Sequence, residues 1–134
     1  MSKSAIYAVN TEVGSAVPTG VFFPFEDIVR RFGNNVNLVN SGIVLKGSGY
    51  YSVSVNLTLT ATAADEMTAT LFQDGTPVPG ATASVTMAAI GDVATLSIDA
   101  LVRVLGYCDT SVLTVRLSSQ PVTNVSSSIE VEKK

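Results

Sequence analysis

The sequence predicts an all-β protein, an antiparallel sandwich or barrel, and three observations carry this prediction. Long segments alternate apolar and polar residues with a period of two, which is typical of strands with one buried face. Turn residues separate these segments about every eight to twelve residues. The clearest alternation is GSGYYSVSVNLTLTATA, residues 47–63, in which one row is apolar and the other consists of Ser, Thr and Asn.

The expected strands, about ten in number, follow one another along the whole chain. In chain order they cover residues 5–9, 20–23, the two halves of 36–45, 50–62, 67–73, 81–87, 94–105, 112–118 and 125–131. Asp74-Gly75 suits the two positive-φ positions of a type I′ hairpin turn. Pro77 and Pro79 follow this turn. Because proline lacks an N–H, the returning strand is expected to be short or to lie at a sheet edge.

One segment departs from the strand pattern. In PFEDIVRRF, residues 24–32, the apolar residues Phe25, Ile28, Val29 and Phe32 have helical spacing. A segment of this length is short for an autonomous helix. Either a short helix or an irregular connector with apolar anchors is therefore expected there.

The composition indicates a single domain, residues 1–134, that associates with other chains. The chain is 46% hydrophobic and 14% charged, whereas ordinary soluble domains are roughly 25% charged. The mean hydropathy is +0.39, but no apolar run approaches the ~20 residues that span a bilayer, so membrane insertion is not expected. Oligomerisation is the expected means of covering the surplus apolar surface.

The distribution of charge argues against nucleic acid as a partner. The net charge is −3, and the basic residues form no patch with interleaved aromatic residues. The N-terminal stretch MSKSAIYAVNTEVGSA lacks the continuous apolar core of a secretory signal. Synthesis in a cytoplasm is therefore expected.

Catalysis is not expected, because the chain contains no His. This removes the commonest general base, the usual serine triad and most zinc sites. The single cysteine, Cys108, excludes an internal disulfide and has no imidazole to activate it, so it is expected to be a small buried apolar residue. No catalytic residue and no cofactor are assigned.

Two acidic loop positions, Asp65-Glu66 and Asp109, are candidate Ca²⁺ ligands, because this cation prefers hard oxygen donors. Neither segment has the closely spaced carboxylates of a dedicated site. Solvated turns are therefore expected, and no metal is assigned.

Arg30-Arg31 is the most unusual polar feature, since it lies between Val29 and Phe32. The pair is a candidate contact for an acidic partner surface. The simpler expectation is an ordinary ion pair with Glu26-Asp27 or with a neighbouring protomer.

The order of the elements resembles the jelly roll of the C1q and tumour-necrosis-factor superfamily. The resemblance rests on Asn34-Asn35 before a glycine-bounded strand (SGIVLKG), on the step Gly49-Tyr50-Tyr51 that opens the long strand, and on the hairpin LFQDGT. A Gly91-Asp92 turn and a strand that ends near the C-terminus complete it. It implies an antiparallel jelly-roll sandwich.

Over residues 6–132 the chain looks most like small bacterial and bacteriophage members of this superfamily, particularly those of gut Firmicutes and their phages. The elements that carry this resemblance are IYAVNT, VRRFG, GSGYYSVSV, LFQDGTPVPGATAS and VTNVSSSIEVE. The aromatic content of 7%, without Trp, is low for the mammalian branch.

The resemblance implies a tight homotrimer in which long strands lie near a three-fold axis. The row that contains Tyr50, Ser52 and Ser54 suits either a close contact between protomers or a solvated sheet face. Leu101 and Leu105 interrupt the polar row of residues 94–105 and are expected at the interface. The alternative is a β-bulge that turns these two leucines inward.

Two functions follow from these expectations. The first is a structural protein of a phage particle, of the capsid-decoration or head-fibre type, on the virion surface and in contact with a capsid or other virion protein. The second is an adhesive module on a bacterial or spore surface that binds a host-surface glycan. Few aromatic residues are free to line a glycan cleft, which favours the structural role. The absence of a recognisable secretory signal favours it too, because virions assemble in the cytoplasm.

Overall fold

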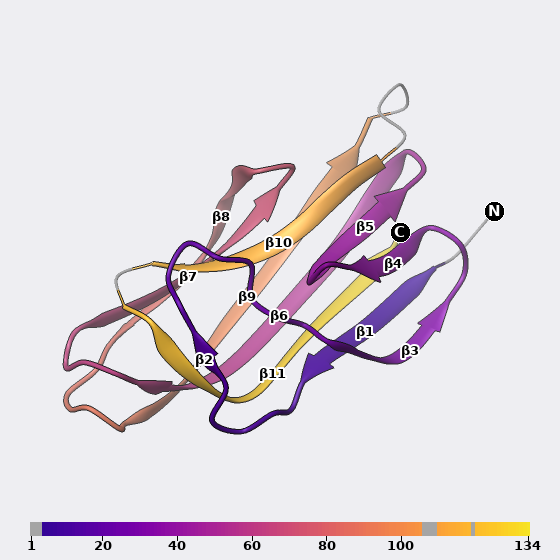
Figure 1. The fold of residues 1–134 in the computed structure, drawn as a ribbon. Helices are drawn as coiled ribbons and strands as arrows, with labels where there is room; N and C mark the ends of the chain where they lie inside the picture. Colours follow the sequence, from indigo (N-terminus) through magenta and orange to yellow (C-terminus); the bar gives the residue numbers. More distant parts are fainter. Residues whose placement is uncertain (1–3, 106–109, 119) are drawn as a thin grey trace.

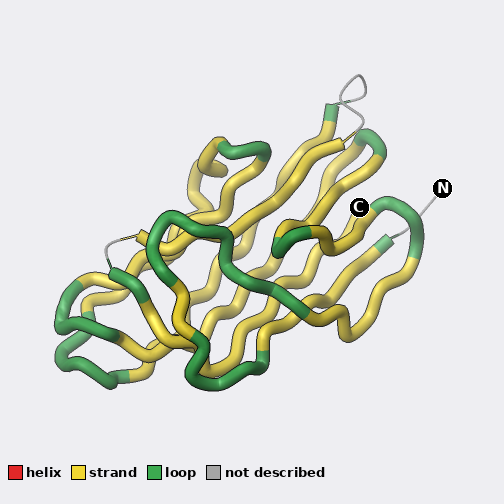
Figure 2. The backbone as a smooth tube through the Cα atoms, in the orientation of Figure 1, coloured by secondary structure: helices red, strands yellow, loops and turns green. Residues whose placement is uncertain are grey.

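The computed structural model describes residues 4–105, 110–118 and 120–134. All regular secondary structure in these residues is β-strand, eleven strands in total. They form two antiparallel sheets that lie face to face as a sandwich (Figure 1; Figure 2). The predicted all-β jelly roll is confirmed.

The first sheet has the strand order β3-β1-β11-β6-β9, and the two-residue β2 also pairs with β11. Its long central strands alternate between buried and less buried residues, with one break at the register shift between Asn124 and Ser126 of β11, which is why the period-two pattern identified them. The bounds are β1 Ala5–Asn10, β2 Ala16–Val17, β3 Asp27–Phe32, β6 Gly49–Ala61, β9 Val93–Val104 and β11 Val122–Lys133.

The second sheet has the order β4-β5-β10-β7-β8. Its strands are β4 Val36–Val39, β5 Gly42–Lys46, β7 Glu66–Gln73, β8 Thr76–Thr86 and β10 Thr110–Ser118. The hairpin prediction is confirmed, since Asp74 and Gly75 have φ values of 53° and 82°. The proline-containing β8 lies at the sheet edge, as its missing N–H groups require.

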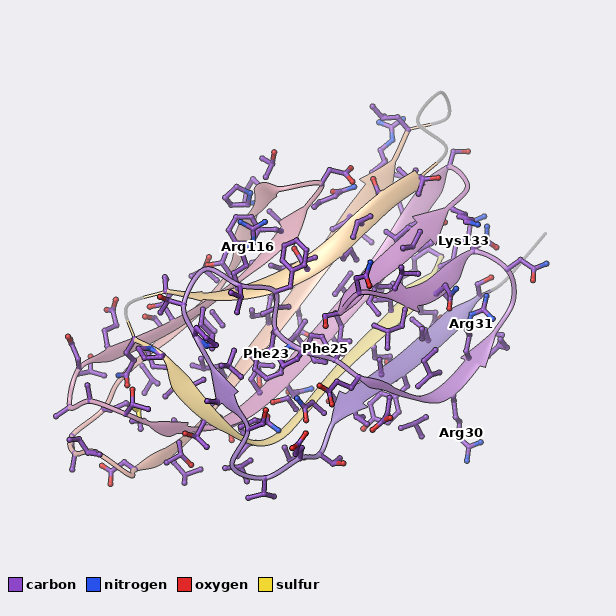
Figure 3. The ribbon with its side chains drawn as sticks, viewed as in Figure 1. Phe23, Phe25, Arg30, Arg31, Arg116 and Lys133 are labelled. Carbon is purple, nitrogen blue, oxygen red and sulfur yellow. The ribbon has the colours of Figure 1, made fainter. Side chains whose placement is uncertain are left out.

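The core fills the space between the sheets with the apolar rows of the long strands. From β6, every second side chain from Tyr51 to Leu59 is buried. Phe23 and Phe25 add two rings to this core, with their centroids 5.0 Å apart (Figure 3). The opposite row of β6 therefore faces away from the second sheet.

The segment 24–32 is not a helix, and only its first residues match the expected connector. Phe25 is buried as an anchor, but Asp27–Phe32 forms β3, an edge strand paired with β1. All its residues are exposed. Pairing with β1 supplies hydrogen bonds that so short a helix would not retain, so tertiary context overrides the spacing.

Residues 20–23 do not form a regular strand, and the sequence did not reveal β2. The segment instead runs beside the C-terminal half of β10, where Phe22 makes an isolated bridge to Arg116. The Phe23 N–H donates to the Val115 carbonyl at 2.6 Å. This placement buries the Phe23 ring and leaves the Phe22 ring on the outer face of the second sheet.

Gln120 holds two loops together from a buried position. Its Oε1 accepts hydrogen bonds from the N–H groups of Thr62 and Ala63, both at 3.0 Å. Its Nε2 donates to the carbonyls of Asp65 and Glu66, at 3.0 and 3.2 Å. One amide side chain thus satisfies the backbone of the loop between β6 and β7.

Candidate functional site: the outer face of the first sheet

The outer face of the first sheet, called here the assembly face, presents aligned rows of side chains. Strand pairing places Ser54 of β6 between Glu130 of β11 and Asp99 of β9. Leu101 of β9 pairs in the same way with Ser52 of β6. Since paired residues project to the same side of a sheet, these side chains share the face that points away from the core.

Large apolar side chains are exposed at both margins of the assembly face. Leu101 is 60% exposed at the β9 margin and Phe32 is 59% exposed at the β3 margin. Tyr7, Tyr50 and Val93 are also exposed on this face. Exposed apolar groups of this kind make the face a candidate surface for contact with another molecule.

Leu101 points outward from the sheet, and its place at an interface stays a prediction. The pairing of β6 with β9 runs from Gly49 and Val104 to Thr60 and Val93 without a register shift. No β-bulge therefore turns Leu101 inward. Leu105 follows the last residue of β9 and is partly buried, so it lies at the end of the face and not within it.

A shallow pocket lies at the opposite margin from Leu101, where β1, β3 and β11 run together. Its volume is about 190 Å³, and its lining consists of Ala5, Ile6, Tyr7, Arg30, Phe32 and Glu130. Tyr7 pairs with Arg30 on one side and with Glu130 on the other. The pocket therefore has an apolar centre between a cation and an anion.

Arg30 and Arg31 have different roles. Figure 3 shows the Arg30 side chain projecting away from the sandwich, where it lines the pocket. Arg31 lies on the other side of the strand and donates from Nε to the Val36 carbonyl at 2.6 Å. Within the part of the chain that the structure describes, neither arginine forms the intrachain ion pair that the sequence suggested. Of these two arginines, only Arg30 is available on the assembly face.

Along β6 and β9 the assembly face carries small polar side chains. Ser97 Oγ donates to Asn56 Oδ1 at 2.9 Å, and the hydroxyls of Thr58 and Thr95 lie 3.3 Å apart. These cross-strand pairs satisfy one another and project little from the sheet. A second protein surface can therefore approach the sheet closely at this point.

The outer face of the second sheet carries a second pocket, of about 430 Å³, that the sequence did not indicate. It is lined by Phe22, Asp74, Gly75, Val112, Thr114 and Arg116. The Arg116 guanidinium carbon lies 4.9 Å from the Phe22 ring centroid and 4.6 Å from the Phe72 ring centroid. The cation therefore lies in contact with two aromatic rings.

The remaining candidates are Cys108 and the acidic loop residues. Cys108 and Asp109 lie outside the described residues. The Asp65 carboxylate accepts a hydrogen bond from the Glu66 N–H at 2.7 Å, which is ordinary turn chemistry. In residues 4–105, 110–118 and 120–134, no three His, Cys, Asp or Glu side chains gather as a metal cluster. The same residues contain no helix that could cross a membrane.

One titratable group is perturbed by its surroundings. Burial raises the pKa of the Tyr51 hydroxyl above its ordinary value of 10.0, and a hydrogen bond involving Asn35 opposes this shift. The hydroxyl donates to the carbonyls of Lys46 and Gly47, at 2.9 and 2.8 Å. These contacts stabilise the protonated phenol, so Tyr51 has a structural role beneath the assembly face.

Comparison with known proteins identifies the fold and no closer relationship. No family model matches the chain, and no curated protein matches it. Solved structures do match: TNF Eiger from S. frugiperda has a TM-score of 0.72 at 12% identity, covering 98% of this chain and 91% of that one. The globular domain of zebrafish complement 1qA has a TM-score of 0.66 at 12% identity, with coverages of 96% and 94%.

A virus-related protein has the same fold. The vertex protein P5 of PRD1 matches with a TM-score of 0.65 at 16% identity, covering 97% of this chain and 96% of that one. At such identities the likeness establishes shared architecture alone. The chain thus has a C1q/TNF-like jelly roll.

Proposed function

We propose that the chain is a homotrimeric, non-enzymatic structural module of a phage particle, assembled through the outer face of its first sheet. The observation that carries this proposal is the exposure of Tyr7, Phe32, Tyr50, Val93 and Leu101 on that one face. A second copy of the chain is the occupant, because the face contains both a protruding apolar residue and a pocket of matching chemistry.

The protruding residue is Leu101, and two charges flank it along β9. Asp99 and Arg103 project on the same side, two residues before and after it, and lie about 13 Å apart along the strand. In the pocket at the other margin, Arg30 and Glu130 flank Tyr7 across two strand spacings, about 10 Å apart. Leu101 of one protomer can therefore enter the pocket of the next with Asp99 near Arg30 and Arg103 near Glu130.

This contact is heterologous, because the two surfaces that meet are different parts of the chain. Heterologous contacts close into rings when the rotation between protomers fits a whole turn, and three copies are the number that the superfamily resemblance implies. The assembly therefore explains the apolar surplus of the sequence.

The phage assignment is supported by the jelly roll shared with the vertex protein of phage PRD1 and by the resemblance of motifs such as GSGYYSVSV to phage proteins. On this proposal the trimer is a decoration or fibre element at the virion surface and contacts a capsid or other virion protein. Arg30 remains assigned to the contact between protomers, and Arg31 to the fold.

Two measurements test the proposal separately. Light scattering coupled to size exclusion determines the assembly, and a trimer of the 13.9 kDa chain is expected. A stable monomer at micromolar concentration would refute the assembly. The particle role is tested with purified virions from the phage that encodes the chain: the protein is expected in their mass spectrum and, by immunogold labelling, on their surface. Its absence from intact particles would leave the trimer standing and remove the phage role.

A further inference from the structure

We infer that the pocket on the outer face of the second sheet is a binding site for an acidic sugar unit, with Arg116 as its carboxylate receptor. This site is separate from the assembly face and does not depend on the proposed phage role. The argument rests on how Arg116 is held, on the polar groups at the other end of the pocket and on the exposed aromatic ring at its side.

Arg116 is a held cation without an acceptor. Phe22 and Phe72 contact it from two neighbouring segments and restrict its side chain. Its Nε is buried and has no hydrogen-bond partner. No carboxylate in the described part of the chain pairs with it, so the donors that remain for a ligand are those of the two Nη nitrogens. A guanidinium held in this way is arranged for bidentate contact with a carboxylate.

The floor of the pocket is the outer row of β10, on which Val112, Thr114 and Arg116 alternate with residues that face the core. Thr114 is only 4% exposed, so the floor is well packed although it faces outward. Asp74 lies at the far end of this row, where it binds Val112, whose backbone position is about 13 Å along the strand from that of Arg116.

The position of Asp74 is fixed. Its Oδ1 accepts a hydrogen bond from the Val112 N–H at 2.9 Å, and its Oδ2 accepts one from Ser111 Oγ at 2.7 Å. Each carboxylate oxygen has a second lone pair, so Asp74 can also accept hydrogen bonds from hydroxyl groups of a ligand. A cation at one end and hydroxyl acceptors at the other suit a ligand that has a carboxylate and several hydroxyls.

The exposed ring of Phe22 favours a sugar over a simple anion. This ring is 43% exposed beside the pocket and offers an apolar surface to the C–H groups of a pyranose. The volume of about 430 Å³ lies within the range of small-molecule sites. Uronic and sialic acids combine all three features: a carboxylate, hydroxyls and an apolar ring face.

The test is a calorimetric titration of the intact protein with sodium glucuronate, galacturonate and N-acetylneuraminate. Glucose, sodium acetate and a short peptide with a free C-terminal carboxylate serve as comparison ligands. At least one acidic sugar is expected to bind, and to perturb the amide NMR signals of Gly75 and Thr114. No binding by any acidic sugar overturns the inference. Equal binding of glucose overturns the role of the carboxylate, and equal binding of acetate or the peptide overturns recognition of a sugar.

Arg116→Gln is expected to weaken acidic-sugar binding by about tenfold or more, the effect of losing charge-assisted hydrogen bonds. Lys46→Gln is the matched control, since it removes one positive charge from an exposed position of the same sheet and should leave the affinity unchanged. Phe22→Leu keeps the cation and removes the ring, so it should also weaken binding. It provides the test if Arg116→Gln fails to fold. Unchanged affinity for acidic sugars in a folded Arg116→Gln or Phe22→Leu variant would show that the contacts of Arg116 with the two phenylalanine rings only stabilise the fold.

Discussion

Leu101 of β9 lies directly opposite Ser52 of β6 on the assembly face, a large exposed apolar side chain paired with one of the smallest polar ones. The short side chain of Ser52 does not cover Leu101, which therefore projects from the face. This relationship gives the assembly proposal its most direct test.

Leu101→Asp is expected to abolish the trimer, because it would bury a carboxylate in an apolar contact. Exclusion chromatography with light scattering should show aggregates or unfolded chain instead of the trimer. Ile90→Asp is the matched control, since Ile90 is 74% exposed in the loop before β9 and belongs to none of the strands that form the face. It should leave the trimer intact. A trimeric Leu101→Asp protein would place the contact elsewhere.

Charge reversal tests the orientation of the contact. Arg30→Glu should weaken assembly, because it places a carboxylate opposite Asp99 of the next protomer. Adding Asp99→Arg in the same chain restores opposite charges and should recover much of the lost association, an effect that rising salt weakens. Sedimentation velocity measures the extent of trimer dissociation for each variant. If the double variant assembles no better than Arg30→Glu, the proposed pairing is wrong.

Tyr51→Phe is expected to lower the free energy of unfolding by about 1–2 kcal/mol near neutral pH, because the carbonyls of Lys46 and Gly47 lose their shared donor. The raised pKa of Tyr51 means that the folded state holds this proton more tightly than the unfolded state. That stabilisation is complete below pH 10 and is lost as the pH rises through the folded-state pKa.

The stability difference between wild type and Tyr51→Phe should therefore narrow above about pH 10. Urea denaturation at several pH values measures it. Tyr50→Phe, on the exposed face, is the control, and its difference from wild type should not follow this trend. A gap that widens with pH would contradict the assigned direction of the shift.

Gln120→Leu should destabilise the protein by about 2–4 kcal/mol, because it leaves several backbone groups of the loop between β6 and β7 without partners. Denaturant unfolding provides the value, and hydrogen exchange should accelerate first at the amides of Thr62 and Ala63, which bond to its Oε1. Ser118→Ala, at an exposed neighbouring position, should cost little. Unchanged exchange at Thr62 and Ala63 would show that the loop is held by other contacts.

The sequence predicts those parts of the fold that depend on local pattern. The alternation of residues 50–62 located β6 to within one residue at either end and placed Tyr50, Ser52 and Ser54 on one face, because side-chain direction in a strand has a strict period. The turn at Asp74-Gly75 was predictable for a similar reason, since its backbone angles favour particular residue types.

The features that escaped prediction depend on contacts between distant segments. The spacing around Phe32 suggests a short helix or a connector, because the pairing of Phe32 with Ala5 of β1 leaves no local signal. The Arg116 pocket requires Phe22 to lie beside β10, and nothing in the residues around either position encodes that approach. The sequence shows that Leu101 is an apolar residue within a polar row. Only the unbroken register of β6 with β9 establishes that its side chain points outward.

The Lys133 N–H donates to the Ser4 carbonyl at 2.9 Å, which places the two ends of the described chain side by side (Figure 1). A fusion partner attached at either end would therefore emerge from the same pole of the sandwich. For the same reason the whole unit can be inserted into a surface loop of another protein without separating the two sides of that loop. The loops at the opposite pole, including the one that Gln120 organises, would stay unobstructed, which makes this jelly roll a natural display scaffold with one pole for attachment and one for presentation.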